Sequence, residues 1–600
     1  MRKIKNIIGS AVVAAALGCS SMMTSCTDYL TIYPTNTVIL ENYWKTAEDV
    51  NAMLATCYSS MANSDVIKRM MIWGELRADN MTTRSSASTD LKYIVDANLL
   101  ETNSYFKWEK FYATINYCNI LIKYAPGVLN EDPDFTQGDL DVILGEAYAL
   151  RAFCHFVLVR SFGRVPMSFV AMDADNQPMV YPQYSPYEAL DSVYVDLQRA
   201  TALCMKSGGW SDNKKNVSRI TKNAVYAMMA DVNLWRAACA AYTQKATAEE
   251  KDILYVPSHY TVGDPATYCT MAIENCDSVL VNMKRKLFKD YEDENRPMTG
   301  LDTLSNPYYL CVNDPLKIKE YPTIYDEIFW GKEEKRDGYK SPQEVIFKLD
   351  FSTNNYNNAV SDFYGYDKSS GSFQVPSKAE IALEDGLYES NDTRYSSYIS
   401  AGKGGTSSGG NEGTVYDITK YVIKTANREK GIEYQKAGLN ESDWIFYRQT
   451  DVLLMKAQAL AFRYTPAEVE GDLSADHKEA FKIVQSVNRR NLSVLKDTLQ
   501  SKDFKSQEDL KTLVFDERLR ELTYEGKRWY DLVQKALWEG KTSNIVELII
   551  KKLDNSSGSV SSKMQHVNTL FCPVYEKELI LNPLLKQNPA FERNSSTELN

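Results

Sequence analysis

The stretch FDERLRELTYEGKRWYDLV, residues 515–533, has the most informative pattern in the chain. Ser506 and Asp509 precede it with the hydroxyl-and-acid spacing of a helix start. Three glutamates recur at every fourth residue and would repel one another unless cations lie nearby: Glu517, Glu521 and Glu525. Three arginines are close enough in sequence to be those cations: Arg518, Arg520 and Arg528. Gly526 allows the helix to end or kink, so charge spacing alone predicts a salt-bridged packing helix.

The composition is that of a folded protein with a large core. Hydrophobic residues make up 44% of the 600 residues, and this length suits several domains or one large helical array. The net charge of −11 argues against a nucleic-acid partner, because phosphate binding needs clustered cations. Tyrosine is in excess, at 39 residues, which suits a surface that binds sugars or peptides but also suits a large core.

The N-terminus has the pattern of a targeting segment. A basic start is followed by an apolar run over residues 7–17, which is too short to span a bilayer. Cys19 and Cys26 both follow a small residue, so either could be a lipidation site. We find no later apolar run of membrane-spanning length.

Several stretches have the composition of closely packed helices. Residues 145–166 (GEAYALRAFCHFVLVRSFGRVP) place small residues and aromatics four residues apart, and Gly163 and Pro166 would end this helix. Residues 222–241 and 450–464 repeat the alternation of alanine with large residues. Each of these three stretches is followed by a second helix with an alanine at its expected crossing point: Ala189, Ala272 and Ala480. A tetratricopeptide-type repeat consists of such helix pairs. Here insertions interrupt the regular spacing of the repeats along the sequence.

The remaining elements are two early helices and a long irregular region. We predict helices at residues 42–61 and 108–124. Residues 287–436 are rich in Tyr, Asn, Asp, Gly and Ser and have little helical periodicity. Within them, residues 344–348 alternate like a short strand. The glycine-serine loop at 402–413 lacks the spacing of a phosphate loop, so we predict no nucleotide site there.

Four motifs together resemble the SusD/RagB family, outer-membrane lipoproteins of Bacteroidetes-type bacteria that bind nutrients at the cell surface. They are the 515–533 string, ELR-x-DN at 75–80, R-x-x-D-V-L-L-M at 448–455 and an E…NP…QNP ending at 578–589. Gln458 and Asn488 depart from the family pattern, which suggests divergence in packing rather than lost function, and Tyr575 replaces a proline of the family's ending. Cys26-Thr27-Asp28-Tyr29-Leu30 is similar to the family's mature start. The resemblance therefore implies a signal peptide of residues 1–25 and lipidation of Cys26.

The resemblance implies a mainly α fold. It consists of a tetratricopeptide-like scaffold of about four helix pairs and a large irregular, loop-rich insertion that carries short strands. Residues 26–600 would form a single domain. Its parts would be a scaffold at about 40–286 and 437–540, a ligand-binding insertion at about 287–436 and a C-terminal segment at 541–600.

The resemblance also implies a function in polysaccharide utilisation. The protein would capture a glycan at the cell surface, lipid-anchored in the outer membrane, and pass it to a SusC-like TonB-dependent transporter that it covers like a lid. Family members bind ligand on a shallow surface formed by the loop after the first helices and by the irregular middle region. The candidates are Trp73, Arg77, Asp79 and Asn80 from the first, and Tyr321, Tyr325, Trp330, Tyr339, Tyr364 and Tyr366 from the second. Each could instead pack in the core or anchor a loop, and Trp73 could lie beneath the scaffold.

The sequence shows no constellation typical of an enzyme. The four histidines lack metal-ligand spacing, and we interpret His155, on a packed helix, as a core residue. We therefore predict no metal, no cofactor and no catalytic site. The nine cysteines after Cys26 include no CxxC, and we predict that most are free and buried. Three alternatives remain open: a peptide-binding member of the same family, a glycoside hydrolase with facing acids in an aromatic cleft, and a pure assembly scaffold.

Overall fold

The computed structural model describes residues 43–592 except 175–176, 178–179, 213, 294–306, 312–322, 331–343, 366–370, 378, 383–385, 404–413, 423, 428–430, 435–439, 464–471, 493–497 and 554–557. The fold is mainly helical and has few, short strands. The long helices are α3 (Ala47–Met61), α6 (Glu109–Tyr124), α7 (Gln137–Phe162), α8 (Pro186–Leu203), α10 (Lys222–Thr243), α11 (Pro265–Asp293), α15 (Gln449–Arg463), α16 (Ala475–Arg489), α17 (Gln507–Leu522) and α18 (Arg528–Glu539).

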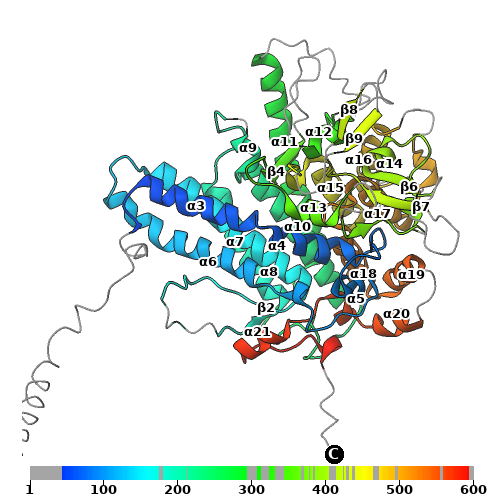
Figure 1. Ribbon diagram of the computed structural model, residues 1–600, viewed down its shortest axis with the longest axis horizontal. Coiled ribbons are helices and arrows are strands. Elements are labelled where there is room, and N and C mark those ends of the chain that lie inside the picture. The colour runs from blue at the N-terminus through cyan, green and yellow to red at the C-terminus, as the bar shows by residue number, and fades with distance from the viewer. Residues whose placement is uncertain are drawn as a thin grey trace, which may run out of the picture.

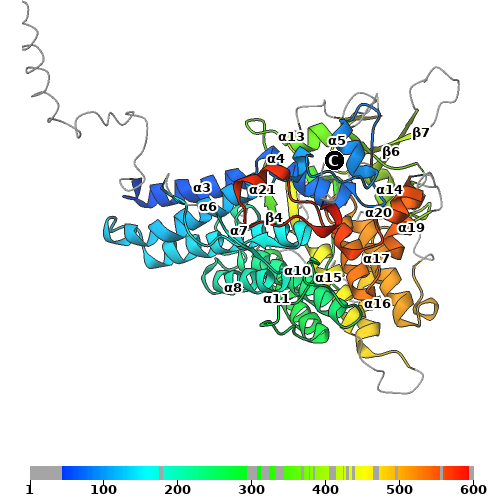
Figure 2. The same ribbon diagram turned by 90° about the horizontal axis from the view of Figure 1, so that it is seen from below.

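These long helices pack side by side nearly in chain order. Contacts run from α3 to α6, α7, α8, α10, α11, α15, α16 and α17, so each helix touches the next. Figures 1 and 2 show this array, with α3 and α6 at one end and α16 and α17 at the other. The predicted pairs are therefore neighbours: α7 with α8, α10 with α11 and α15 with α16.

Local capping signals set the helix boundaries. Thr136 and Asp139 form a capping box, which starts α7 eight residues before the predicted residue 145. The same device at Ser506 and Asp509 starts α17 where the sequence predicted it. Gly163 ends α7 at a φ of 75°, a conformation that favours glycine.

Helix α7 lies in the middle of the core. It is long and apolar enough to cross a membrane, but 83% of its most apolar window is buried inside the protein. From Gly145 to Phe162 nearly every side chain is buried, which explains why small residues recur along it. His155 is fully buried there and accepts a hydrogen bond from the Ser168 backbone N–H at 3.2 Å. Burial lowers the pKa of His155 to about 3, as suits a neutral core histidine.

Nine cysteines lie within the described residues, and all nine are free thiols. Eight are buried and Cys311 is half-buried. Burial raises the pKa of Cys239 to about 12, so this thiol is a packing group. The prediction of mostly free, buried cysteines is confirmed for these nine.

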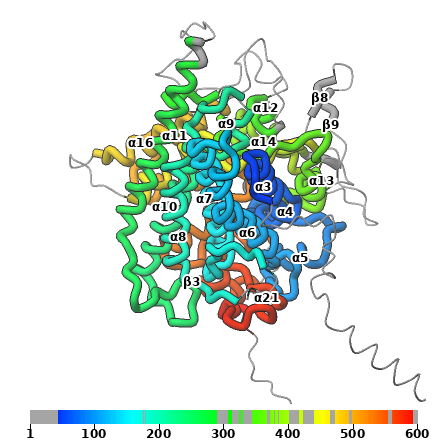
Figure 3. Tube along the Cα trace, turned by 90° about the vertical axis from the view of Figure 1, so that its left-hand side faces the viewer, coloured from blue at the N-terminus to red at the C-terminus, as the bar shows by residue number. Residues whose placement is uncertain are grey.

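The middle region lies along one side of the helical array. Its helices are short: α12 (Ile324–Trp330), α13 (Asn358–Phe363) and α14 (Thr393–Tyr398). Its strands are β4 (Val345–Leu349), β5 (Phe373–Gln374), β6 (Ile399–Lys403), β7 (Thr414–Ile418), β8 (Lys424–Asn427) and β9 (Gly431–Tyr434). In Figure 3, α13 and β9 lie on the opposite side of the molecule from α8 and α11.

The described strands form antiparallel two-stranded pairs. Strands β6 and β7 pair with each other, as do β8 and β9. Strand β4 pairs with β10 (Trp444–Arg448), which leads directly into α15 and so joins the middle region to the array. Strand β1 (Thr82–Thr83) pairs with β5, and β2 (Val165–Pro166) pairs with β3 (Gln183–Tyr184).

The remaining helices complete the two ends of the chain. After α3 come α4 (Ser64–Met71), a π-helical turn η1 (Ile72–Leu76) and α5 (Thr89–Val95). The short helix α9 (Lys215–Ser218) precedes α10, and the chain closes with α19 (Ser543–Lys552), α20 (Gly558–Lys563) and α21 (Glu576–Leu581). Thus η1 contacts α18, and the first helices lie against the last.

Candidate functional site

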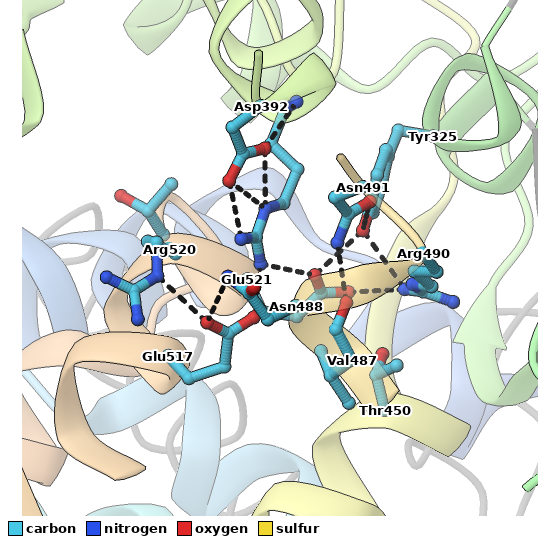
Figure 4. Close-up of polar contacts among 12 residues, drawn as sticks. Tyr325, Asp392, Thr450, Val487, Asn488, Arg490, Asn491, Glu517, Arg520 and Glu521 are labelled. Atoms are coloured by element: carbon cyan, nitrogen blue, oxygen red, sulfur yellow. Dashed lines mark hydrogen bonds and ion pairs between the residues drawn. The ribbon is translucent and has the colours of Figure 1, made fainter. Parts of the chain in front are cut away.

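The glutamates of α17 lie at the centre of a buried charge cluster. Glu521 is fully buried, and its carboxylate accepts hydrogen bonds from Arg448 at 2.7 Å, Arg490 at 2.6 Å and Arg394 at 3.1 Å. The Tyr325 hydroxyl donates a fourth bond, at 2.7 Å (Figure 4). One carboxylate therefore joins α14, β10 and the C-terminus of α16 to α17.

Two more glutamates extend this cluster. Glu517 accepts from Arg394 and Arg520, and Glu525 accepts from Arg448 and Lys420. The buried charge cluster thus contains five cations and five carboxylates: Arg394, Lys420, Arg448, Arg490 and Arg520, with Glu344, Asp392, Glu517, Glu521 and Glu525. Its charges balance, which a buried ionic cluster requires.

The predicted arginine partners are mostly wrong. Only Arg520 pairs with one of the three glutamates, as an i,i+3 pair with Glu517. Arg518 instead pairs with Asp531, and Arg528 pairs with Asp79. Because the glutamates face the interior, their main partners come from other elements rather than from the same helix.

The buried charge cluster predicts loss of stability in acid. Burial alone would raise the pKa of Glu521, but Arg490, Arg448 and Arg394 hold it well below its usual range. A carboxyl whose pKa is lower in the folded state contributes stability above its unfolded pKa, near 4.5, and loses it as pH falls through the folded pKa. We expect the free energy of unfolding, measured with urea, to fall steadily from pH 5 to pH 3. A constant value over this range would contradict the cluster's role.

The ELR-x-DN segment, residues 75–80, packs in the interior against the 515–533 stretch. The Glu75 carboxylate accepts from the backbone N–H groups of Tyr524 at 2.7 Å and Lys527 at 2.9 Å. Asp79 holds the Arg528 guanidinium with two hydrogen bonds, at 2.8 and 2.9 Å. Although burial alone would raise it, the Arg528 charge holds the pKa of Asp79 below its usual range. These contacts show how the 75–80 motif and the 515–533 motif form one packed unit.

The four ligand residues predicted from the first loop therefore lie at this interior contact: Trp73, Arg77, Asp79 and Asn80. Trp73 is fully buried, stacks on Phe111 and donates to the Tyr105 carbonyl. Arg77 lies 4.0 Å over the Trp529 ring, and Asn80 donates to Glu75 and Thr523. In this structure Trp73 has no exposed face for stacking on a sugar, and Arg77 is bound within the protein.

Two of the predicted tyrosines of the middle region are also buried. Tyr325 and Tyr364 are each 1% exposed, the first bonded to Glu521 and the second to the Tyr524 carbonyl. Both anchor the middle region to α17 and the loop after it, so neither is part of an exposed platform here. The side chain of Trp330, at the end of α12, lies outside the described residues, as do Tyr321, Tyr339, Tyr366 and Cys26.

The two segments predicted to form the ligand surface do meet. Strand β1, in the loop after the first helices, pairs with β5 of the middle region. Arg84, directly after β1, forms a buried ion pair with Asp417 of β7. Lys68 of α4 and Asp362 of α13 add a second ion pair, at 2.5 Å. These contacts fix the first loop against the middle region.

A pocket of about 150 Å³ opens beside this junction. Asp79 and Asn80 line it from the first loop, Ile381 and Leu387 from the middle region, and α17, α18 and α19 from the C-terminal part. The Lys552 ammonium lies in its wall and donates to the Ala78 carbonyl at 2.8 Å. Burial lowers the pKa of Lys552 to about 7. We refer to this site as the Lys552 pocket.

Within the described residues no group of His, Cys, Asp and Glu side chains is arranged to hold a metal ion. The acids of the buried charge cluster are occupied by cations and face the interior.

Comparison with known proteins places the chain in a family. A sequence profile for the SusD family matches residues 279–591, more than half of the chain. The chain belongs to the SusD family. A second profile, described as "Starch-binding associating with outer membrane", matches residues 28–234. The SusD family consists in general of non-catalytic binding proteins associated with the outer membrane.

Two curated relatives extend over nearly the whole chain. SusD-like protein P38 of Formosa agariphila is 24% identical over 600 residues, 98% of this chain and 99% of the relative. SusD-like protein P2 of the same organism is 23% identical over 565 residues, 90% of this chain and 91% of the relative. The match therefore includes both the array and the middle region.

Solved structures share the SusD fold. A SusD homolog from Bacteroides thetaiotaomicron has a TM-score of 0.62 at 16% identity, covering 92% of this chain and 98% of that chain. A SusD superfamily protein from Bacteroides fragilis has a TM-score of 0.61 at 18% identity, covering 92% of this chain and 100% of that chain. At these identities the likeness describes the fold alone.

The sequence did not predict which distant residues complete the buried charge cluster and the Lys552 pocket. Arg448 begins the R-x-x-D-V-L-L-M motif, but no local spacing connects it, Arg394 or Arg490 to Glu521. Lys552 follows Lys551 at a helix C-terminus, a position typical of surface lysines that favour the helix dipole. Only the packing of α19 against η1 and the loop after it shows that Lys552 is buried.

Proposed function

We propose that this protein is a lipid-anchored cell-surface protein that binds an oligo- or polysaccharide without hydrolysing it. In this proposal it passes the glycan to a SusC-like TonB-dependent transporter in the outer membrane. The observation that carries the proposal is the junction between β1 and β5, where the two segments expected to form the ligand surface are fixed together. Membership of the SusD family gives this junction its functional meaning.

The architecture supports a binding protein rather than a hydrolase. A glycosidase needs two accessible acids some 5–10 Å apart across a cleft. The three glutamates of the 515–533 stretch are instead held by cations in the buried charge cluster. Within the middle region, Asp362 and Asp417 are paired with Lys68 and Arg84. The helical array, which we infer to be a tetratricopeptide-type scaffold, would act as a rigid support for the ligand surface.

The binding surface would consist of aromatic rings and polar loops beyond the buried anchors. Trp330, Tyr321, Tyr339 and Tyr366 are the proposed stacking residues, because the other two predicted tyrosines, Tyr325 and Tyr364, are buried anchors. Sugars present apolar C–H faces to such rings and hydroxyl groups to Asn, Asp and Arg side chains.

Calorimetric titration of a soluble chain starting at Thr27 tests this function. A panel of polysaccharides and a peptide digest would be titrated, and hydrolysis products would be assayed in the same samples. We expect saturable glycan binding without turnover and an affinity about three- to tenfold weaker for Trp330→Ala, since an aromatic contact contributes about 0.5–1.5 kcal/mol. Trp330→Phe, which retains a ring, should bind nearly as well as the parent.

Each other outcome assigns a different function. Turnover would make the protein a hydrolase, and binding of peptides alone would make it a peptide-binding member of the family. No binding of either class would leave an assembly scaffold. Equal affinity of Trp330→Ala and the parent would place the stacking surface elsewhere.

A further inference from the structure

The Lys552 pocket differs in charge from the protein around it. The chain carries a net charge of −11, yet four cations and only two carboxylates line this pocket: Arg528, Lys535, Lys551 and Lys552, with Asp79 and Asp516. Asp79 is already bound to Arg528 by two hydrogen bonds. Because an acidic protein concentrates positive charge here, the pocket favours an anionic ligand.

Lys552 is the most deeply buried of the three lysines in the pocket wall. It is 7% exposed, and it donates to the carbonyls of Ala78 at 2.8 Å and Leu76 at 3.4 Å. Within the described part of the chain its ammonium forms no ion pair with a carboxylate. Asp79 and Asp96 act on this ammonium at longer range, without a direct ion pair. Burying an ammonium that lacks a direct partner is costly, and an anion in the pocket would supply that partner.

Two further features of the pocket match a sugar ring. Asn80 is 1% exposed, and its Oδ1 has no hydrogen-bond partner, so a ligand hydroxyl could donate to it. Apolar side chains cover the other walls, among them Ile381, Phe515 and Leu519. The volume of about 150 Å³ limits the buried part of a ligand to a single six-membered ring.

We propose that the Lys552 pocket binds a single acidic sugar residue. Its carboxylate or sulfate group would face Lys552 and the rim lysines Lys535 and Lys551, one hydroxyl would donate to Asn80, and the apolar face of the ring would pack on Phe515 and Leu519. This inference rests on the proposed glycan-binding function and deepens it, because it makes the ligand an acidic glycan.

Three sugars with the same ring test the inference by calorimetry: galacturonate, galactose 6-sulfate and galactose. We expect galacturonate, galactose 6-sulfate or both to bind at least tenfold more tightly than galactose, and their ratio identifies the preferred acid group. Inorganic sulfate is the control for charge alone. Tighter binding of inorganic sulfate than of both acidic sugars would overturn the proposal of a sugar site.

Variants of the pocket locate the binding. Lys552→Met, which keeps the chain length and removes the charge, should weaken binding of the acidic sugar at least tenfold. Lys535→Ala and Lys551→Ala, at the pocket rim, should each weaken it about threefold, and they decide the question if Lys552→Met does not fold. Lys541→Ala is the matched control, because Lys541 is exposed between α18 and α19 but does not line the pocket.

The two proposals can fail separately. If neutral polysaccharides bind and the acidic sugars do not, the pocket inference is wrong and the glycan-binding function stands. If no glycan of any kind binds, the proposed function itself fails. Binding of acidic sugars that Lys552→Met and both rim variants leave unchanged would also overturn the assignment of the pocket.

Discussion

Replacing Glu521 with alanine should lower the free energy of unfolding by about 3–5 kcal/mol, the cost of removing one partner from a buried ionic group. The substitution leaves the cluster with one uncompensated positive charge shared among three arginines: Arg394, Arg448 and Arg490. It also removes the acceptor of the Tyr325 hydroxyl. Equilibrium unfolding in urea measures the change, and protease sensitivity of the middle region shows whether that region detaches first.

Glu508→Ala is the matched control for this prediction. Glu508 lies on the same helix, but its side chain is 68% exposed and its distance to Lys511 is 4.0 Å. An exposed pair of this kind contributes about 0–1 kcal/mol. A loss of stability in Glu521→Ala no larger than in Glu508→Ala would show that the buried charge cluster does not hold the middle region in place.

Replacing Gly74 with alanine should destabilise the protein by about 3 kcal/mol or prevent folding. A Cβ at this position would lie 1.9 Å from the Gly526 carbonyl oxygen and 2.9 Å from the Tyr530 ring. The obstructing atom belongs to the backbone, and Gly526 has a φ of 74°, so the loop cannot adjust easily. Thermal unfolding and soluble yield measure the effect.

Gly127→Ala is the control for the substitution itself. No atom lies within 4 Å of the Cβ that it would add, so we expect a change within about 0.5 kcal/mol. If Gly74→Ala were as stable as Gly127→Ala, the close approach of η1 to the loop before α18 would not be needed for folding.

Both predictions, for Glu521 and for Gly74, test contacts made by the 515–533 stretch. Gly74 and Glu75 belong to the turn η1, and Gly526 and Glu525 belong to the 515–533 stretch. The hydrogen bond from the Lys527 N–H to Glu75 joins η1 to the start of α18. The ion pair between Arg394 and Glu517 joins the middle region to α17. The stretch 515–533 therefore connects the two ends of the chain with the region proposed to bind ligand.

The sequence by itself determined the elements whose signals are local. Capping residues such as Ser506, the stop at Gly163 and the alternation of alanine with large residues act within a few turns of one helix, so they can be recognised without the fold. The strand predicted at residues 344–348 corresponds to β4 (Val345–Leu349) for the same reason. The four motifs together also identified the family, which the profile match confirms.

Only the tertiary structure decided which residues face the interior and what they contact there. Trp73 and Tyr364 have the residue type of a sugar platform, but packing against distant elements buries both. Glu521 and its three arginines are separated by 31 to 127 residues, so no helical spacing could pair them. A buried charge takes its partners from whichever elements enclose it, and sequence distance does not limit that choice.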